Sequence, residues 1–239
     1  MNEDVFLKEM KKIGYELNEV QLLLFNNYFH LLIEYNQHTN LTTIIQKEDV
    51  YLKHFYDSAA LIRKTDFNQI NNFVDVGTGA GFPGVVIKIL YPHLSLILID
   101  SNNKKTSFLE HLCHQLLLEN VEIKCARSED FARDNIDKYD CVVARAVKQL
   151  DVLSEICIPL VKIGGFFIAM KANIDEEINN SKDIIAKLGG EIITIDNFSL
   201  PIEGSVRNNI KIKKTRVTPL GYPREYSTII KKALKKNQI

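Results

Sequence analysis

Hydrophobic positions in the first sixty residues recur every three or four residues. Leucines, a valine and a tyrosine follow this spacing between residues 18 and 37, and the stretch contains no proline and no glycine after Gly14. Apolar residues at this spacing form one face of a helix, and glycine and proline are the residues that interrupt helices. The pattern predicts an all-helical N-terminal appendage over residues 1–64.

From residue 65 to residue 239 the pattern changes to short apolar runs that alternate with amphipathic segments. The runs cover residues 72–77, 94–100, 121–126, 139–145, 164–171, 191–198 and 207–215. Helical patterns lie between them at 83–91, 103–118, 150–161 and 174–188. This alternation is typical of βαβ units. We expect an α/β domain with a seven-stranded, mostly parallel sheet, and an antiparallel hairpin where only the loop 199–205 separates the last two strands.

The length of 239 residues suits one sizeable α/β domain with an appendage. No apolar run approaches the roughly 18 to 20 residues that cross a bilayer. The N-terminus is acidic and polar, without the basic and apolar regions of a secretory signal. We therefore expect a cytoplasmic, monomeric protein that is not attached to a membrane.

The four cysteines stand far apart and form no C-x-x-C pair. Three of them lie in strongly apolar contexts, such as EIKCA and YDCVVA. We interpret them as reduced core thiols rather than metal ligands or disulfides, and we expect no metal site.

The formal net charge is zero, but the charges are unevenly distributed. Residues 205–239 contain ten Lys or Arg and one acid, Glu225. Such a basic end can attract phosphates, although a solvated lysine-rich tail is an alternative. Arginine is scarce, with 7 Arg against 23 Lys. The positions where a planar, bidentate donor is indicated are Arg145, Arg207, Arg216 and Arg224.

The stretch FVDVGTGAGFPG, residues 73–84, contains two overlapping glycine patterns. Residues 79–84 have the G-x-G-x-x-G spacing of a dinucleotide-binding turn. The same stretch also places an acid, Asp75, before Gly77, Gly79 and Gly81, as in S-adenosylmethionine enzymes. A glycine turn between a strand and a helix lets a ligand approach the backbone. Asp100 ends the next strand and is placed to accept ribose hydroxyls, which both cofactors possess.

Asp75 favours S-adenosylmethionine. Dinucleotide phosphates require N–H donors and no nearby anion, whereas S-adenosylmethionine carries an ammonium and a sulfonium. A second role for Asp75, capping the loop backbone, is compatible with this one. An NAD-dependent oxidoreductase is the alternative enzyme, disfavoured because about 155 residues after Gly84 leave little room for a second catalytic domain. A non-catalytic RNA-binding protein is the third possibility.

Further short motifs run in order from residue 40 to residue 224. They are NLT (40–42), HFYDS (54–58), DVGTGAGFPG (75–84), DS (100–101), KK (104–105), FL (108–109), ARSE (126–129), ARA (144–146), GG (164–165) with Lys171, and YPR (222–224). With these motifs the chain resembles the bacterial RsmG family, also called GidB, which methylates N7 of a guanine in 16S ribosomal RNA. One departure is Ala172, where a glycine often follows the family's lysine.

The resemblance implies the class I S-adenosylmethionine-dependent methyltransferase fold, which is Rossmann-like, with S-adenosyl-L-methionine as cofactor. It implies 16S ribosomal RNA or the small ribosomal subunit as partner. The cofactor contacts implied are Gly77, Gly79, Phe82, Asp100, Ser128, Glu129 and Arg145, to which the loop pattern adds Asp75 and Gly81.

The chemistry of this reaction requires little from the protein beyond geometry. Guanine N7 has an exposed lone pair, so attack on the methyl group needs no general base, and we expect catalysis by positioning. Arg145 is the predicted catalytic residue, contacting the methionine carboxylate or guanine O6, with a strand-end ion pair as the alternative.

The predicted phosphate contacts are all basic residues in the second half of the chain. They are Lys171, Arg207, Lys213, Arg216 and Arg224, and a solvated surface is the alternative for each. His54 and Asp57 lie three apart on one face of a predicted helix, where they can pair with each other or line an RNA cleft.

Overall fold

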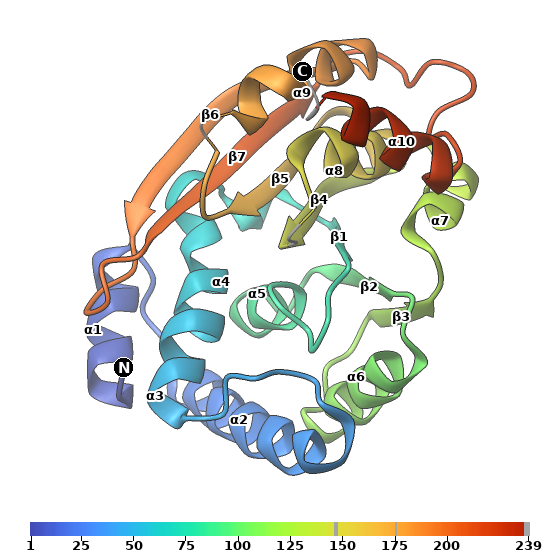
Figure 1. Cartoon of the computed structure of the whole chain (residues 1–239). Helices are drawn as coiled ribbons and strands as arrows, with labels where there is room; N and C mark the ends of the chain where they lie inside the picture. The colour runs from blue at the N-terminus through green and yellow to red at the C-terminus, as the bar shows by residue number, and fades with distance from the viewer. Residues whose placement is uncertain (146–147, 175, 237–239) are drawn as a thin grey trace.

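A computed structural model describes residues 1–145, 148–174 and 176–236, and its centre is a seven-stranded sheet (Figure 1). The strands are β1 (Asn72–Val76), β2 (Ser95–Asp100), β3 (Val121–Cys125), β4 (Tyr139–Arg145), β5 (Val161–Lys171), β6 (Gly190–Ser199) and β7 (Val206–Lys214). Their order is β3-β2-β1-β4-β5-β7-β6. Strands β1 to β5 are parallel, and β7 runs antiparallel to both β5 and β6. The predicted seven strands and the edge hairpin are confirmed.

Helices cover both faces of this sheet (Figure 1). On one face lie α1 (Glu3–Lys12), α2 (Glu19–Thr39), α3 (Lys47–Val50), η1 (Tyr51–Tyr56), α4 (Asp57–Ala59), η2 (Ala60–Lys64), η3 (Phe67–Gln69), α5 (Gly84–Leu90) and α6 (Asn103–Gln115). On the other lie α7 (Ser128–Asp134), α8 (Leu150–Cys157), η4 (Ile158–Leu160), α9 (Glu177–Lys187) and α10 (Tyr226–Lys236). The patterns did not predict α7 or α10.

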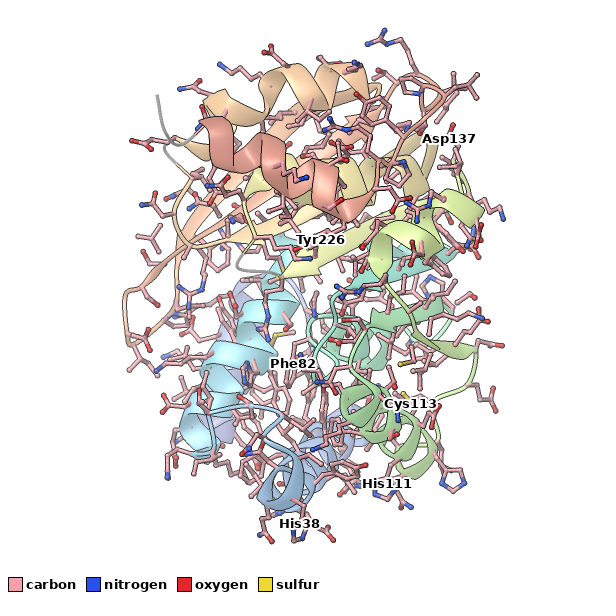
Figure 2. The ribbon with its side chains drawn as sticks, turned by 45° about the vertical axis from the view of Figure 1, so that its right-hand side comes forward. His38, Phe82, His111, Cys113, Asp137 and Tyr226 are labelled. Carbon is pink, nitrogen blue, oxygen red and sulfur yellow. The ribbon has the colours of Figure 1, made fainter. Side chains whose placement is uncertain are left out.

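Local sequence sets the start and the end of α2. Asn18 and Gln21 form a capping box at the start of α2, and Asn40 ends the helix with a left-handed φ of 49°. The next helical turns start at residue 47, so the predicted helical appendage is interrupted over residues 40–46. Helix α2 also lies beside α6. His38 of α2 and His111 of α6 line a hollow between the two helices (Figure 2).

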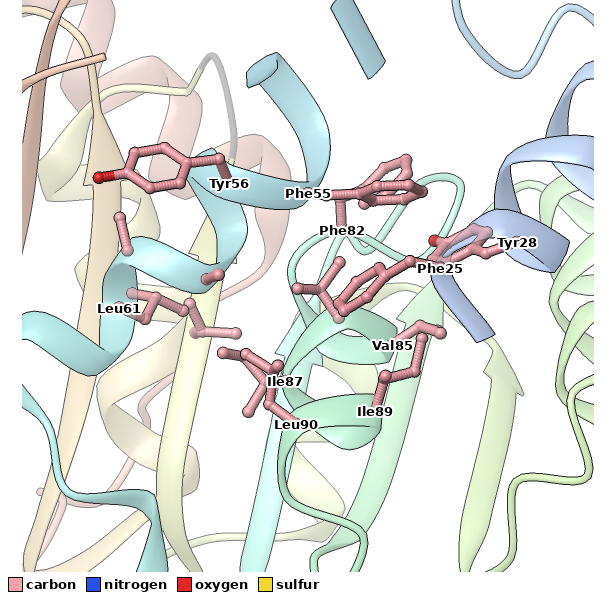
Figure 3. Packing of buried hydrophobic residues seen from close by; sticks show 14 of the residues in the cluster. Phe25, Tyr28, Phe55, Tyr56, Leu61, Phe82, Val85, Ile87, Ile89 and Leu90 are labelled. Atoms are coloured by element: carbon pink, nitrogen blue, oxygen red, sulfur yellow. The ribbon is translucent and has the colours of Figure 1, made fainter. Parts of the chain in front are cut away.

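One hydrophobic core joins these helices to the sheet domain (Figure 3). Phe25 and Tyr28 of α2 and Phe55 of η1 are fully buried; Tyr28 and Phe55 pack against Phe82, which follows β1, and Phe25 packs against Phe55. Burial of each such ring contributes about 1.5 to 3 kcal/mol. The Gln21 amide also donates to the carbonyl of Ile89, at 3.1 Å. Residues 1–64 are therefore held against the sheet domain along α5.

The insertion of β7 between β5 and β6 decides which residues meet at each end of the sheet. In the antiparallel register Lys171 faces Asn208 and Met170 faces Asn209, whereas Phe166 faces Lys213. The start of β7 therefore lies beside the carboxyl ends of β4 and β5. Its end lies at the opposite edge, roughly 17 Å away at 3.3 to 3.4 Å per residue.

The four cysteines form no disulfide, and three of them, Cys113, Cys141 and Cys157, are buried. Burial raises the pKa of the Cys113 thiol to about 12. The prediction of a core thiol is wrong for Cys125, which is exposed because β3 is the edge strand of the sheet. In the ranges that the structure describes, no helix combines the length and apolar character needed to span a bilayer.

Candidate active site

The glycine loop between β1 and α5 opens toward empty space at two of its three predicted glycines. Gly77 and Gly79 have φ angles of +72° and +64°, and a Cβ at either would meet no atom within 4 Å. Gly81, with φ of +100°, differs because a Cβ there would lie 2.6 Å from the Tyr28 hydroxyl. The first two glycines leave room for a ligand, and the third allows close packing of α2.

Asp75 is fully buried at the end of β1. Its Oδ2 accepts hydrogen bonds from the Thr78 hydroxyl and the Gly84 N–H, both at 2.7 Å. Its Oδ1 has no hydrogen-bond partner among the described residues. Burial raises the pKa of this carboxyl to about 6. Asp75 therefore caps the loop, which is the second role predicted for it, and one of its carboxylate oxygens has no partner among the described residues.

Asp100, at the end of β2, stabilises the same loop through hydrogen bonds. Its carboxylate accepts the N–H of Gly79 at 3.1 Å and the N–H of Asn102 at 2.9 Å. Ser128 and the buried Glu129 begin α7 directly after β3. The carboxyl ends of three neighbouring parallel strands thus bring the loop and these residues to one edge of the sheet, where open α/β sheets bind ligands.

The ring of Phe82 is enclosed by protein side chains. It stacks on Tyr28 at 5.2 Å with an interplanar angle of 10°, and on His54 at 4.4 Å and 19°. The Tyr28 hydroxyl donates to the carbonyl of Ala80 at 2.6 Å. Only 3% of Phe82 is exposed. Its side chain therefore anchors the glycine loop to the N-terminal helices.

Arg145 ends β4, and its guanidinium lies 5.1 Å from the Phe82 ring centroid. It donates to the carbonyl of Lys53 at 3.1 Å and to Nδ1 of His54 at 3.3 Å. Burial, and after it the charge of Arg145, lowers the pKa of His54 to about 3. His54 is therefore neutral near pH 7, with Nδ1 as acceptor and Nε2–H donating to the Thr42 hydroxyl at 3.1 Å.

Asp57 lies between two guanidinium groups. Its Oδ2 is 3.5 Å from Nη1 of Arg145, and its Oδ1 is 3.3 Å from Nε of Arg207. Burial raises the pKa of Asp57, while both arginines act in the opposite direction. The predicted neighbours His54 and Asp57 therefore both contact Arg145.

A cleft of about 470 Å³ opens next to this cluster, at the ends of β4 and β5 and the start of β7. Its lining contains donors, acceptors and apolar groups, namely Asp57, Arg145, Met170, Lys171, Ala172, Asn173, Glu177, Arg207 and Asn209. A second hollow shares Ala172, Asn173 and Arg207 with it. Ala146, which follows Arg145 in the matched motif, lies outside the described residues.

The predicted phosphate contacts separate into different places. Lys171 is buried at the cleft, where Nζ lies 2.9 Å from the Glu177 carboxylate. Of the predicted phosphate contacts, Arg207 also lines the cleft. Lys213 is exposed at the far end of β7, and the exposed Arg216 donates to a carbonyl at the end of α9.

Arg224 lies on the other face of the sheet, beside α8. Its Nε and Nη2 donate to the two carboxylate oxygens of the buried Glu155, at 2.6 and 2.5 Å. The basic C-terminal end is therefore distributed over the molecule rather than gathered into one patch.

Several residues that shape the site were not singled out in the sequence. Tyr28 and Lys53 contact residues 52 and 92 positions away, at Ala80 and Arg145, and no local pattern signals such contacts. Asn209 was detectable in principle, because two asparagines interrupt an otherwise apolar and basic strand. No cluster of three or more potential metal ligands occurs among the residues that the structure describes.

The fold and the loop define a class I S-adenosylmethionine-dependent methyltransferase architecture. The fold is similar to that of M. jannaschii TYW2 in complex with AdoMet, with a TM-score of 0.55 and 16% identity over 72% of this chain and 79% of that one. It is also similar to a 16S rRNA (adenine(1408)-N(1))-methyltransferase from Catenulisporales acidiphilia, with a TM-score of 0.53 and 12% identity over 62% and 87%. The predicted fold class is confirmed.

The particular family follows from sequence similarity. The model of the GidB family, described as rRNA small subunit methyltransferase G, matches residues 21–204. Proteins named ribosomal RNA small subunit methyltransferase G from Bacillus licheniformis and Bacillus subtilis are 48% and 47% identical, over 95% of this chain and 97% of theirs. The chain belongs to this family, so the predicted resemblance is confirmed.

Proposed function

We propose that this protein transfers a methyl group from S-adenosylmethionine to N7 of a guanine in 16S ribosomal RNA. Its relatives are named for methylation of small-subunit ribosomal RNA. The observation that carries the proposal is the position of Arg145, which lies over Phe82 of the glycine loop and also lines the cleft. A methyl donor on the loop and a base in the cleft would meet at this side chain.

The residues at the loop fit S-adenosylmethionine, which supplies an electrophilic methyl sulfonium when bound. Gly77 and Gly79 leave open space, and the unpartnered Oδ1 of the buried Asp75 suits a cation. Asp100 at the end of β2 is the proposed contact for the ribose hydroxyls, and Ser128 and Glu129 at the start of α7 are the proposed contacts for the adenine edge. Membership in a methyltransferase family favours this cofactor over NAD.

The protein's contribution to the reaction is positioning. Guanine N7 attacks through its own lone pair, so no side chain has to remove a proton. Arg145 holds the methionine carboxylate or guanine O6, while His54 and the Lys53 carbonyl hold Arg145. Such alignment is worth up to about 7 to 11 kcal/mol in favourable systems, after a few kcal/mol to unstack the base.

The RNA backbone runs from Arg207 at the cleft toward the exposed cations at the far end of β7. Arg207 lies at the cleft, and the exposed Lys213 and Arg216 lie farther along the same polypeptide segment. Lys171 and Arg224 already pair with Glu177 and Glu155, so we assign them to holding the cleft wall and the C-terminal segment in place. The N-terminal helices support the glycine loop through Tyr28 and His54.

The test is methyl transfer from labelled S-adenosylmethionine to small ribosomal subunits and to naked 16S RNA, both from cells that lack this gene. Cleavage specific for N7-methylguanine then locates the product. We expect incorporation at a single guanine in one of the two preparations. No incorporation in either, with cofactor binding intact, would disprove the proposed acceptor.

A further inference from the structure

We propose that the side-chain amide of Asn209 pairs with the Watson–Crick edge of the acceptor guanine in the cleft. This inference rests on the proposed function and assigns the residue that reads the base. It makes Asn209 a specificity residue, separate from the residues that hold the cofactor.

The first observation is an unused hydrogen-bond donor at the cleft. Asn209 is 6% exposed, lies on β7 between Met170 of β5 and Asp196 of β6, and lines the cleft. Its Nδ2 has no hydrogen-bond partner among the described residues. Buried polar groups in folded proteins are nearly always paired, so an unpaired donor in the wall of a cleft is available to a group that a ligand brings.

The neighbouring Asn208, on the same strand, has an amide whose hydrogen bonds are made within the protein. Asn208 is 2% exposed, its Nδ2 donates to the Ala172 carbonyl at 2.8 Å, and its Oδ1 accepts from Asn197 at 2.8 Å. Successive side chains on a strand point to opposite faces. The two side chains are therefore similarly buried but lie on opposite faces of the sheet. Of the two amides, only that of Asn209 has an unpaired donor.

An amide is complementary to the guanine edge that lies away from the reacting nitrogen. Guanine presents the acceptor O6 beside the donor N1–H. An asparagine amide presents one donor and one acceptor in matching order, and rotation about χ2 sets which end faces which. With Nδ2–H on O6 and Oδ1 on N1–H, the N7 position stays free to meet the methyl group.

The charges of the cleft fit a polar, uncharged ring better than an isolated anion. Arg145, Arg207 and Lys171 line the cleft together with Asp57 and Glu177, so both cationic and anionic groups face it. A phosphate would use only the donors and would be repelled by the two carboxylates.

The guanidinium groups supply the preference for guanine over adenine. An amide can also pair with adenine by turning over, because adenine carries the N6 amino donor beside the N1 acceptor. Arg145 and Arg207 line the same cleft and attract a carbonyl oxygen, whereas they disfavour an amino group. Asn209 therefore aligns the edge, and the arginines select O6.

The experiment compares Asn209→Ala, Asn209→Asp and Asn208→Ala with the wild type, using small ribosomal subunits or 16S RNA as substrate, whichever the wild type methylates. For Asn209→Ala we expect kcat/KM for RNA to fall about 10- to 100-fold. Asn209→Asp, which keeps the shape but cannot donate to O6, should lose at least as much. Asn208→Ala should lower the Tm and leave transfer per folded molecule within about threefold.

Cofactor binding and stability distinguish this inference from a structural role. Removing an unpaired donor should leave the Tm of Asn209→Ala unchanged or raised, and its Kd for S-adenosylmethionine should stay within about twofold. Wild-type transfer by both Asn209 variants, or loss of cofactor binding in Asn209→Ala, would overturn the inference alone. Absence of N7 methylation by the wild type would overturn the proposed function as well.

Discussion

Two arginines each meet a buried carboxylate, and the two pairs differ in geometry more than in exposure. The side chains of Arg224 and Arg145 are 26% and 21% exposed, and those of their partners Glu155 and Asp57 are 2% and 8% exposed. Arg224 forms two parallel bonds of 2.6 and 2.5 Å to Glu155. Arg145 approaches Asp57 only to 3.5 Å, and Asp57 is shared with Arg207.

The difference separates an arginine that holds the fold from one that is available to a ligand. In a bidentate pair the guanidinium fork and the carboxylate satisfy each other. Around Arg145 the contacts come instead from a carbonyl, a neutral histidine and a distant carboxylate. An arginine held in this way keeps its orientation and retains donors for a substrate.

Replacing each arginine by lysine is the sharpest test of this comparison. Arg145→Lys keeps the charge and loses the planar fork, so we expect methyl transfer to fall about 100- to 1000-fold with little change in Tm. Arg224→Lys should keep transfer per folded molecule within about threefold. Initial rates at subsaturating RNA and cofactor, with thermal unfolding of both variants, measure this. The opposite pattern would reverse the assignment of the two arginines.

Truncation to alanine should produce the complementary effect on stability. Arg224→Ala leaves Glu155 buried without its partner, and we expect the free energy of unfolding to fall by about 3 kcal/mol. Arg145→Ala leaves Asp57 paired with Arg207 and should cost about 1 kcal/mol. Denaturant unfolding measures both, and Arg224→Ala combined with Glu155→Gln should recover part of the loss. Equal costs for the two alanine variants would contradict the comparison.

Asp75 extends the comparison to a buried carboxylate without a cation in ion-pair contact among the described residues. Its folded pKa is raised to about 6, so ionising it removes stability that is present below about pH 4 and lost as the pH rises through 6. A bound ammonium would favour the ionised form and return the pKa to near 4. Affinity for S-adenosylmethionine should therefore rise about tenfold from pH 5 to pH 7 and then level off.

Calorimetric titration of the cofactor at several pH values tests this expectation. Asp75→Asn is the matched control, since it keeps an acceptor for Thr78 and Gly84 but cannot ionise. If the variant kept the same slope, the titrating group would lie elsewhere.

The smallest effect is expected for a cation far from both pairs. Lys213→Gln should weaken RNA binding about two- to threefold at low salt, reduce the slope against log salt by about 1, and leave kcat unchanged. Arg207→Gln, at the cleft, should also lower kcat, because it removes a partner of Asp57. Filter binding across a salt series with single-turnover rates distinguishes the two. A loss of kcat in Lys213→Gln would contradict the assignment of Lys213 to RNA binding alone.

The sheet was predictable because its strands are apolar and their periodicity is local. The insertion of β7 between β5 and β6 was not, since the pairing of Lys171 with Asn208 spans 37 residues of chain. The basic segment of α10 was interpreted as part of a basic end because its charges obscure an apolar face that includes the buried Ile229.

The geometry of the candidate site was predictable where it depends on one short motif. Gly77, Gly79 and Asp100 lie where the strand-turn-helix pattern places them. Contacts between segments far apart in the sequence could not be predicted from short motifs. The stack of Tyr28 and His54 on Phe82, and the sharing of Asp57 by Arg145 and Arg207, depend on packing that no local spacing specifies.

The aromatic stack on Phe82 also has a consequence for how the chain emerges during its synthesis. Tyr28 is made 54 residues before Phe82, and at roughly 5 to 20 residues per second this corresponds to about 3 to 11 seconds. For that interval the aromatic face of α2 has no glycine loop to cover it. The nascent N-terminal helices therefore expose apolar surface until residues 79–84 complete its burial, and we expect a chain truncated before that point to aggregate.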